Sequence, residues 1–305
     1  MKRAAFPVIL LFSILAAEGQ VTPVTDQYML NPVLINPAFT GGRGVLNIAA
    51  FYRRQWTGIK GAPETVTLAA DAPFIDDKVG LGISIIHDKT GVTRENSFST
   101  SYAYRTEAWN GTISFGLKAG LLTTNTRWSD LVVLDPGDEL YLNDTKVNVV
   151  PDFSFGIYYT SKKYFAGFSV PRLLGYKFNF EKNGYTIKFN PRQYYYLFNG
   201  GYLFEIAPEI NFIPSTLISL SPGEKMLADI NAVFSFSDRM WAGMSYRSTK
   251  SLAGIFQFGV TRQLRFAYTY FIDFGLLGRF NNGSHELMLR YEFQYKANVV
   301  NPLIF

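Results

Sequence analysis

The chain has no cysteine, few charged residues and no second long hydrophobic run. Without cysteine, no disulfide framework can form. Charged residues make up only 17 % of the chain, against about a quarter in ordinary soluble domains. Beyond the N-terminal segment no stretch reaches about eighteen apolar residues, which excludes a later transmembrane helix. The net charge of +5 is scattered rather than clustered, so no nucleic-acid partner is expected.

The N-terminus has the parts of an export signal. Lys2 and Arg3 supply positive charge, and residues 6–17 are apolar. Small residues at Ala17 and Gly19 predict cleavage before Gln20. Residues 1–19 are therefore predicted to be a signal peptide, although a short buried helix also fits the apolar run. The mature chain is expected to leave the cytoplasm.

Aromatic residues and alternating hydrophobicity are abundant. Aromatics make up 16 % of the chain, and residues 44–293 repeat stretches in which apolar residues alternate with small or polar ones. In residues 285–293 one face of the predicted strand is apolar, and the other carries Glu286, Met288, Arg290 and Glu292. A soluble sandwich also alternates. The side chains of the second face are too polar for a core and too small and mixed for a solvent-exposed surface. This favours a barrel in which the second face lines the lumen and the apolar face contacts lipid.

We predict an all-β fold, a transmembrane antiparallel β-barrel of about fourteen strands over residues 44–293. Pro214 makes the strand at 208–218 the weakest of the set. The predicted strands are 45–53, 64–73, 79–88, 95–105, 111–123, 151–159, 164–171, 194–204, 208–218, 227–236, 240–248, 252–260, 264–272 and 285–293.

Short and long connections alternate along the chain, which predicts that both termini are periplasmic and that the long loops lie outside the cell. Trp109 and Trp241 are then expected at the periplasmic rim, and Trp56 and Trp128 at the outer rim. Lys118, Arg265, Glu286, Arg290 and Glu292 are expected to face the lumen.

The lead-in at 20–43 contains two Asn-Pro pairs, and the tail at 294–305 contains a third, Asn301-Pro302. Proline removes a backbone donor and restricts the preceding residue, so we expect an extended periplasmic segment. The lead-in could serve as a plug in the barrel mouth or as a docking surface for a periplasmic partner, or it could be disordered. The candidate plug or partner-binding residues are Gln27, Tyr28, Asn31, Pro32, Asn36, Pro37 and Phe39.

The predicted outer side carries further candidate sites. The loop after the first strand combines arginine and tryptophan, typical of binding anchors and equally of a membrane-rim anchor. Its candidates are Arg54, Gln55, Trp56, Gly61, Ala62 and Pro63. Candidates for the outer mouth or lumen are Asp88, His285, Glu286 and Arg290.

Catalysis is not predicted. His87 and His285 each precede a carboxylate, but neighbours on a strand face opposite ways. Neither a nucleophile elbow nor an HExxH motif is present, so we expect no enzyme activity, no metal and no cofactor.

Four segments resemble the PorP/SprF family of type IX secretion outer-membrane proteins. They are "QYMLNPVLINPAFTG" (27–41), "YRRQWTGIKGAPETVTLAADAPF" (52–74), "GLGISIIHDKTG" (80–91) and "YTYFIDFGLLGRFNNGSHELMLRYEF" (268–293). The chain departs from the family pattern at Phe271-Ile272-Asp273, where the family is expected to have Tyr-Asp. The resemblance implies a barrel of the Bacteroidota outer membrane that works with the type IX machinery. Some members pair with large surface adhesins, also in gliding motility, and others belong to the secretion apparatus.

The residues and the resemblance together predict a non-enzymatic outer-membrane component of type IX secretion. Its expected partners are the secretion machinery, the C-terminal domain of a large secreted surface protein or adhesin, and outer-membrane lipid. It would anchor that protein or assist its export. The alternative is an outer-membrane transporter or porin for small or hydrophobic solutes.

Overall fold

The computed structural model describes residues 27–131, 144–179, 184–188, 190–191, 194–222 and 224–293. The predicted signal peptide, residues 20–26 and the tail at 294–305 lie outside the described residues. Within the described ranges the chain is all-β with a few short 3-10 helices. No helix in these ranges is long and apolar enough to cross a membrane.

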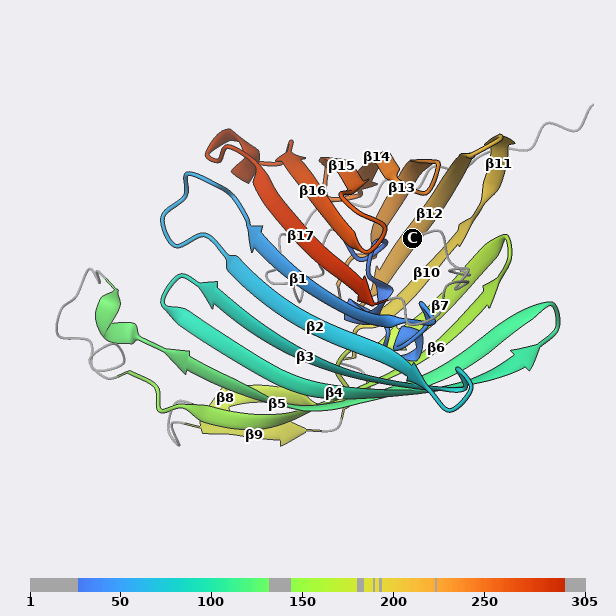
Figure 1. The fold of residues 1–305 in the computed structure, drawn as a ribbon. Coiled ribbons are helices and arrows are strands. Elements are labelled where there is room, and N and C mark those ends of the chain that lie inside the picture. Colours follow the sequence, from blue (N-terminus) through green and yellow to red (C-terminus); the bar gives the residue numbers. More distant parts are fainter. Residues whose placement is uncertain are drawn as a thin grey trace, which may run out of the picture.

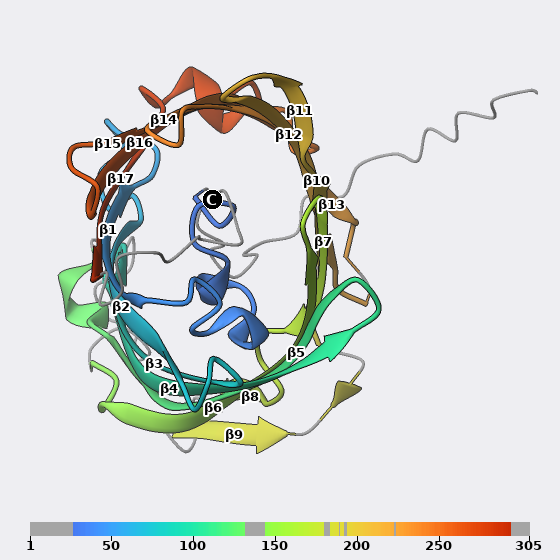
Figure 2. The ribbon, with the colours of Figure 1, turned by 45° about the vertical axis from the view of Figure 1, so that its right-hand side comes forward.

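One antiparallel sheet closes on itself to form a barrel (Figures 1 and 2). β1 pairs with both β2 and β17, and β10 pairs with both β7 and β12. β10 and β11 share one position beside β12, so the barrel has 14 strand positions, as predicted. The strands are β1 (Leu46–Arg54), β2 (Glu64–Phe74), β3 (Val79–Thr90), β4 (Thr93–Ala108), β5 (Gly111–Thr126), β6 (Asn148–Ser161), β7 (Tyr164–Val170), β10 (Tyr196–Tyr202), β11 (Phe204–Ala207), β12 (Ile210–Leu220), β13 (Leu227–Phe236), β14 (Met240–Arg247), β15 (Ser251–Gly259), β16 (Leu264–Asp273) and β17 (Ser284–Phe293).

Alternation along each strand separates an apolar outer face from a buried inner face. On β17, Leu289 is 51 % exposed whereas Arg290 is fully buried. The predicted lumen-facing charges pair there: Lys118 with Asp152 at 3.8 Å and Arg265 with Glu292 at 3.6 Å. Glu286, Arg290 and Glu292 are buried on this inner face as well.

Pro214 lies within β12 rather than ending it. The register places Pro214 opposite the gap between Gly201 and Phe204, where β10 gives way to β11. Because proline has no N–H to donate, the ladder is interrupted on the facing strand while β12 continues.

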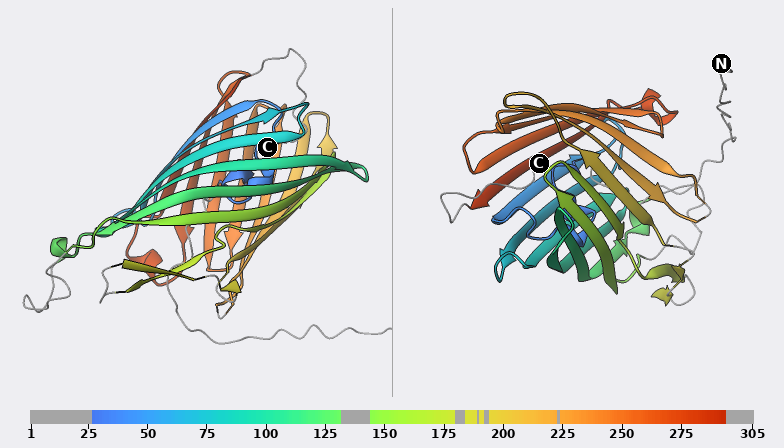
Figure 3. Two further views of the ribbon diagram at one scale, coloured as in Figure 1. Left: turned by 90° about the horizontal axis from the view of Figure 1, so that it is seen from below. Right: turned by 90° about the vertical axis from the view of Figure 1, so that its right-hand side faces the viewer.

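The barrel has a short-turn end and a long-loop end. The chain enters β1 and leaves β17 at the short-turn end, together with turns such as 109–110 and 162–163. The opposite end carries the connections at 55–63, 127–147, 171–195, 221–226 and 274–283, but also two short ones, at 91–92 and 248–250. Within these loops lie η3 (Trp128–Asp130), η5 (Leu277–Arg279) and a separate hairpin of β8 (Gly175–Asn179) and β9 (Gly184–Lys188), outside the barrel wall (Figure 3).

Residues 27–45 lie inside the barrel, and we call this segment the plug (Figure 2). It contains η1 (Pro32–Leu34) and η2 (Pro37–Phe39), so two 3-10 turns interrupt the expected extended segment. Asn36 is extended, as expected before proline, but each proline begins a 3-10 turn. A proline suits the first helical position because its φ is preset and its missing N–H has no helical partner there.

Trp241 also departs from the prediction. It is 1 % exposed and points into the lumen, where Arg265 lies 4.6 Å above its ring. Trp109, by contrast, is 87 % exposed in the turn between β4 and β5, at the predicted rim.

Candidate functional site

All candidate residues of the lead-in are buried in the lumen. The set comprises Gln27, Tyr28, Asn31, Pro32, Asn36, Pro37 and Phe39. Because these residues are buried, the segment fills the lumen as a plug and does not present an exposed docking surface.

Side-chain amides fasten the plug to opposite walls of the barrel. Gln27 Nε2 donates to Thr269 Oγ1 on β16 at 3.2 Å and to the Glu286 carbonyl on β17 at 3.0 Å. Across the lumen, Asn36 Nδ2 donates to the carbonyls of Ile157 on β6 at 3.0 Å and Phe168 on β7 at 3.1 Å. These carbonyls belong to the strands, so each amide satisfies a buried backbone acceptor.

Further contacts extend around the circumference. Asn231 Nδ2 on β13 donates to the Tyr28 hydroxyl at 2.6 Å. The Gly41 N–H donates to Asp71 Oδ2 on β2 at 2.7 Å, and Ser169 Oγ on β7 donates to the Ile35 carbonyl at 2.7 Å. The plug is therefore held by polar contacts from strands on both sides of the lumen.

A buried arginine cluster holds the centre of the plug. Arg43 and Arg290 both donate to the Leu30 carbonyl, Arg290 Nη1 at 2.7 Å. Glu292 lies 3.7 Å from Arg43 Nε and 3.2 Å from Arg290 Nε. Arg290 was a predicted site residue, whereas Arg43 was not. Its charge was the only signal in the sequence, because its partners lie far away along the chain.

Glycines on the inner wall admit the plug. A Cβ atom at Gly116 on β5 would collide with the Ala38 backbone, and one at Gly156 on β6 would collide with Asn36. A Cβ at Gly80 on β3 would collide with the Thr40 carbonyl. The plug thus lies directly against the backbone of three strands.

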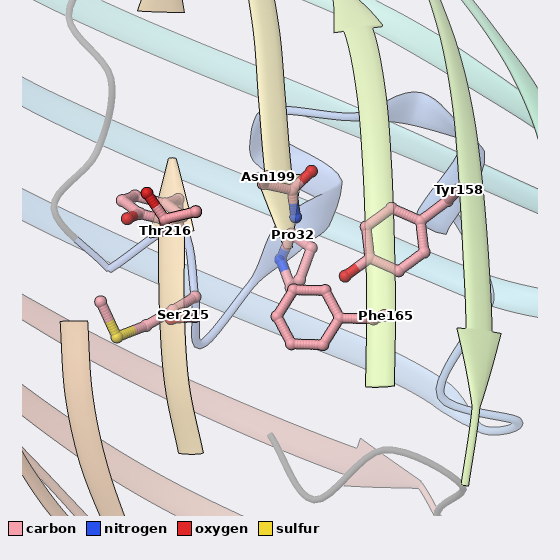
Figure 4. Close-up of a pocket in the computed structure, with 8 residues that line it drawn as sticks. Pro32, Tyr158, Phe165, Asn199, Ser215 and Thr216 are labelled. Atoms are coloured by element: carbon pink, nitrogen blue, oxygen red, sulfur yellow. The ribbon is translucent and has the colours of Figure 1, made fainter. Parts of the chain in front are cut away.

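Apolar packing fills the rest of the interface. Tyr28, Met29, Leu30 and Ile35 share one buried cluster with barrel residues that include Trp241. A gap of about 10 Å³ remains beside Pro32, where the rings of Tyr158 and Phe165 stack 6.0 Å apart (Figure 4). This space suffices for about one water molecule and no larger ligand.

At the long-loop end, three connections form one surface, residues 55–63, 91–92 and 274–283, which we call the long-loop platform. The Thr57 N–H donates to the Gly283 carbonyl at 2.8 Å, and the Asn282 N–H donates to the Thr57 carbonyl at 2.7 Å. The Gly91 N–H donates to the Gly61 carbonyl at 2.8 Å. The predicted loop candidates Gln55, Trp56, Gly61, Ala62 and Pro63 lie on this platform, and Arg54 borders it.

The platform exposes large apolar side chains. Phe274 is 62 % exposed, Leu276 83 % and Phe280 75 %. Ordered loops that display such side chains are typical of protein-binding surfaces.

The remaining candidates do not gather into one site. Glu286 is buried in the lumen, with Oε2 3.9 Å from Arg53 Nε, and Asp88 accepts from Thr65 at 2.5 Å. His285 lies on the outer face, where its Nδ1 is 2.7 Å from the Tyr268 hydroxyl.

His87 also lies on the outer face, with its Nδ1 2.7 Å from Asn96 Oδ1. In the part of the chain that the structure describes, neither His87 nor His285 hydrogen-bonds to a carboxylate, and no group of three potential metal ligands is present.

A closed antiparallel barrel with an apolar outer surface and a polar, occupied lumen defines a bacterial outer-membrane β-barrel protein. The family model "Type IX secretion system membrane protein PorP/SprF" matches residues 17–291. The chain belongs to this family and is therefore an outer-membrane protein associated with type IX secretion.

One solved structure shares the barrel fold at low sequence identity, and a second is similar at a lower score. The CymD monoaromatic hydrocarbon channel is 12 % identical, with a TM-score of 0.51 over 89 % of this chain and 94 % of that chain. The Acinetobacter baumannii outer membrane protein Omp33 is 7 % identical, with a TM-score of 0.49 over 83 % of this chain and 100 % of that chain. The comparison with curated proteins finds no match.

Proposed function

We propose that this protein is a plugged, non-enzymatic barrel that binds a secreted surface protein for the type IX machinery. It anchors that protein, or assists its export, through the secreted protein's C-terminal domain. The observation that carries the proposal is the plug, because a lumen filled by the chain itself suits a binding role better than passage of solutes. Family membership supplies the link to type IX secretion.

In this proposal both termini face the periplasm and the long-loop platform faces outward. The alternation of short and long connections supports this orientation, since outer-membrane barrels keep short turns on the periplasmic side. Periplasmic machinery would then meet the short-turn end, where the plug enters β1. The surface protein would meet the platform.

The platform has suitable chemistry for a protein partner. Leu276 and Phe280 provide exposed apolar contacts. The loop that is hydrogen-bonded to theirs carries Trp56 and is preceded by Arg54, and tryptophan and arginine are residue types that often anchor interfaces. The backbone hydrogen bonds between its loops order the loop backbones before binding, which lowers the entropy lost on association.

Affinity purification tests the proposal. The tagged barrel is isolated from its native outer membrane in mild detergent, and co-purified proteins are identified by mass spectrometry. We expect one large surface protein with a C-terminal export domain, together with secretion machinery. The L276A/F280A variant should lose the surface protein. The F204A/I206A variant also removes one phenylalanine and one aliphatic side chain, but at the short-turn end of the barrel. It should retain the surface protein. A barrel that purifies alone would contradict the proposal.

A transporter for small solutes is the second candidate. It is favoured by buried polar atoms along the plug that have no partner among the described residues, such as Asn31 Nδ2 and both polar atoms of the Gln257 side chain. Buried polar groups of this kind are normally hydrated, and water along the plug would ease its displacement. Ion conductance by the intact barrel, without protein partners, would favour this function.

A further inference from the structure

The outer face of β2 to β5 carries polar and charged residues beyond its apolar belt. One level of this belt is formed by Leu68, Ile85, Phe98 and Leu121, which are 47 %, 47 %, 50 % and 53 % exposed. These residues are aligned across neighbouring strands by the register of the sheet.

Two residues further along β3, β4 and β5 the outer face becomes polar, whereas β2 still carries the apolar Val66 at this level. His87, Asn96 and Thr123 occupy the level, and Asn96 Nδ2 donates to Thr123 Oγ1 at 3.4 Å. After two more residues the level is charged: Glu64 pairs in register with Lys89, and Lys89 with Arg94. The order from apolar to neutral polar to charged is that of a membrane interface.

Cations dominate the charged level. Lys89 and Arg94 are paired in register, and Arg127, just beyond the end of β5, lines a groove together with Arg94. We call these three residues the cationic row, and within the described residues none of them makes an ion pair with a carboxylate. The lumen, by contrast, contains ion-paired cations: Arg247, for example, lies 2.7 Å from Asp229. Unpaired cations at a membrane boundary are available for an anion supplied from outside the protein.

A groove beside the row offers space for a headgroup. It measures about 450 Å³ and is lined by Arg94, Arg127, Asn96, Thr123, Thr124, Asn125, Asp144 and Val147. Asp144 is the one acid in this lining, and its pKa is lowered because the Ser129 N–H and hydroxyl donate to its carboxylate at 3.0 and 2.8 Å. The Arg127 charge also lowers this pKa, so Asp144 offsets part of the Arg127 charge. Arg94 makes no ion pair with a carboxylate among the described residues and remains available for an anion.

We propose that the cationic row of Lys89, Arg94 and Arg127 binds the phosphate groups of a membrane-lipid headgroup, with the acyl chains lying along the apolar belt below. Arginine binds phosphate through paired N–H groups, and lysine adds a point charge. The apolar belt, which lies below the neutral polar level, supplies the second half of an amphipathic site. This lipid site is independent of the proposed secretion role.

Native mass spectrometry of the detergent-solubilised protein tests the site with diphosphoryl lipid A and monophosphoryl lipid A as probes. We expect tighter binding of the diphosphoryl form, and about a tenfold or greater loss in the K89Q/R94Q/R127Q variant. The K78Q/R239Q/R262Q variant removes three exposed cations at the short-turn end and should bind as the unaltered protein does. Folding is checked by the heat-modifiable migration of the barrel, and R94Q alone should give a smaller loss in the same direction.

Equal binding by the K89Q/R94Q/R127Q variant and the unaltered protein would overturn the assignment. So would an equal loss in the K78Q/R239Q/R262Q variant, which would indicate a general charge effect. Complete displacement of lipid A by millimolar inorganic phosphate would identify a free-phosphate site and exclude the lipid source.

Discussion

At the scale of single residues, glycine determines where the plug approaches the wall. Gly116 and Gly156 face the lumen, and the plug backbone and the Asn36 side chain occupy the space in which a larger residue would stand. The absence of native cysteine allows a single introduced thiol to report on this contact without background.

Substitution of Gly116 by valine should expel the plug. Overpacking of this kind costs about 1–3 kcal/mol, so maleimide labelling of a reporter cysteine at Met29 should accelerate by about tenfold or more. Met29 is only 5 % exposed in the plugged form. The matched control is Gly254→Val, because a Cβ there meets nothing within 4 Å. Unchanged labelling in the Gly116 variant would contradict the close contact.

Asn36 anchors the plug through both its amide nitrogen and its amide oxygen. The Asn36→Ala variant loses two hydrogen bonds to wall carbonyls and the bond from the Ala38 N–H, and should lower the local opening free energy by about 2 kcal/mol. Hydrogen exchange in residues 27–43 should then accelerate by about 30-fold. Asn96→Ala, on the outer face, is the control. Equal protection in both variants would argue against anchoring by Asn36.

At the scale of elements, period-two alternation predicts the strands well because every strand has one lipid-facing side. The predicted strand at 264–272 corresponds to β16, Leu264–Asp273. The prediction for Trp241 was wrong because a residue-type preference was given more weight than the alternation along the strand. Trp241 shares the parity of lumen-facing Gly243, but the preference of tryptophan for membrane rims suggested the opposite face. The β8–β9 hairpin was missed because its strands are short and lie within a predicted loop.

The long-loop platform depends on a glycine conformation. Gly283 has a φ of +83°, and a Cβ there would lie 2.7 Å from the Phe271 carbonyl oxygen. Gly283→Ala should therefore strain the platform by about 1–3 kcal/mol and reduce recovery of the surface protein, while the barrel still folds. The measurement is co-purification, with Gly254→Ala as control. Full recovery with Gly283→Ala would show that the tie between loops 55–63 and 274–283 is dispensable.

At the scale of the whole molecule, the sequence indicates the barrel but not what closes it. The lead-in residues were recognised as candidates, and a plug was one of three open alternatives. Their partners are dispersed along the chain: Gln27 contacts Thr269, and Leu30 contacts Arg290. Contacts of such long sequence separation follow from the closed barrel, so local patterns do not reveal them. The arginine cluster at Arg43 was unpredictable for the same reason.

The most direct measurement is the conductance of the purified barrel in planar lipid bilayers, compared with a variant lacking residues 27–43. We expect the intact protein to be silent and the deletion variant to conduct ions in discrete steps, because the plug spans the lumen between opposite walls. Steady conductance by the intact, correctly folded protein would contradict a closed lumen and favour a transporter.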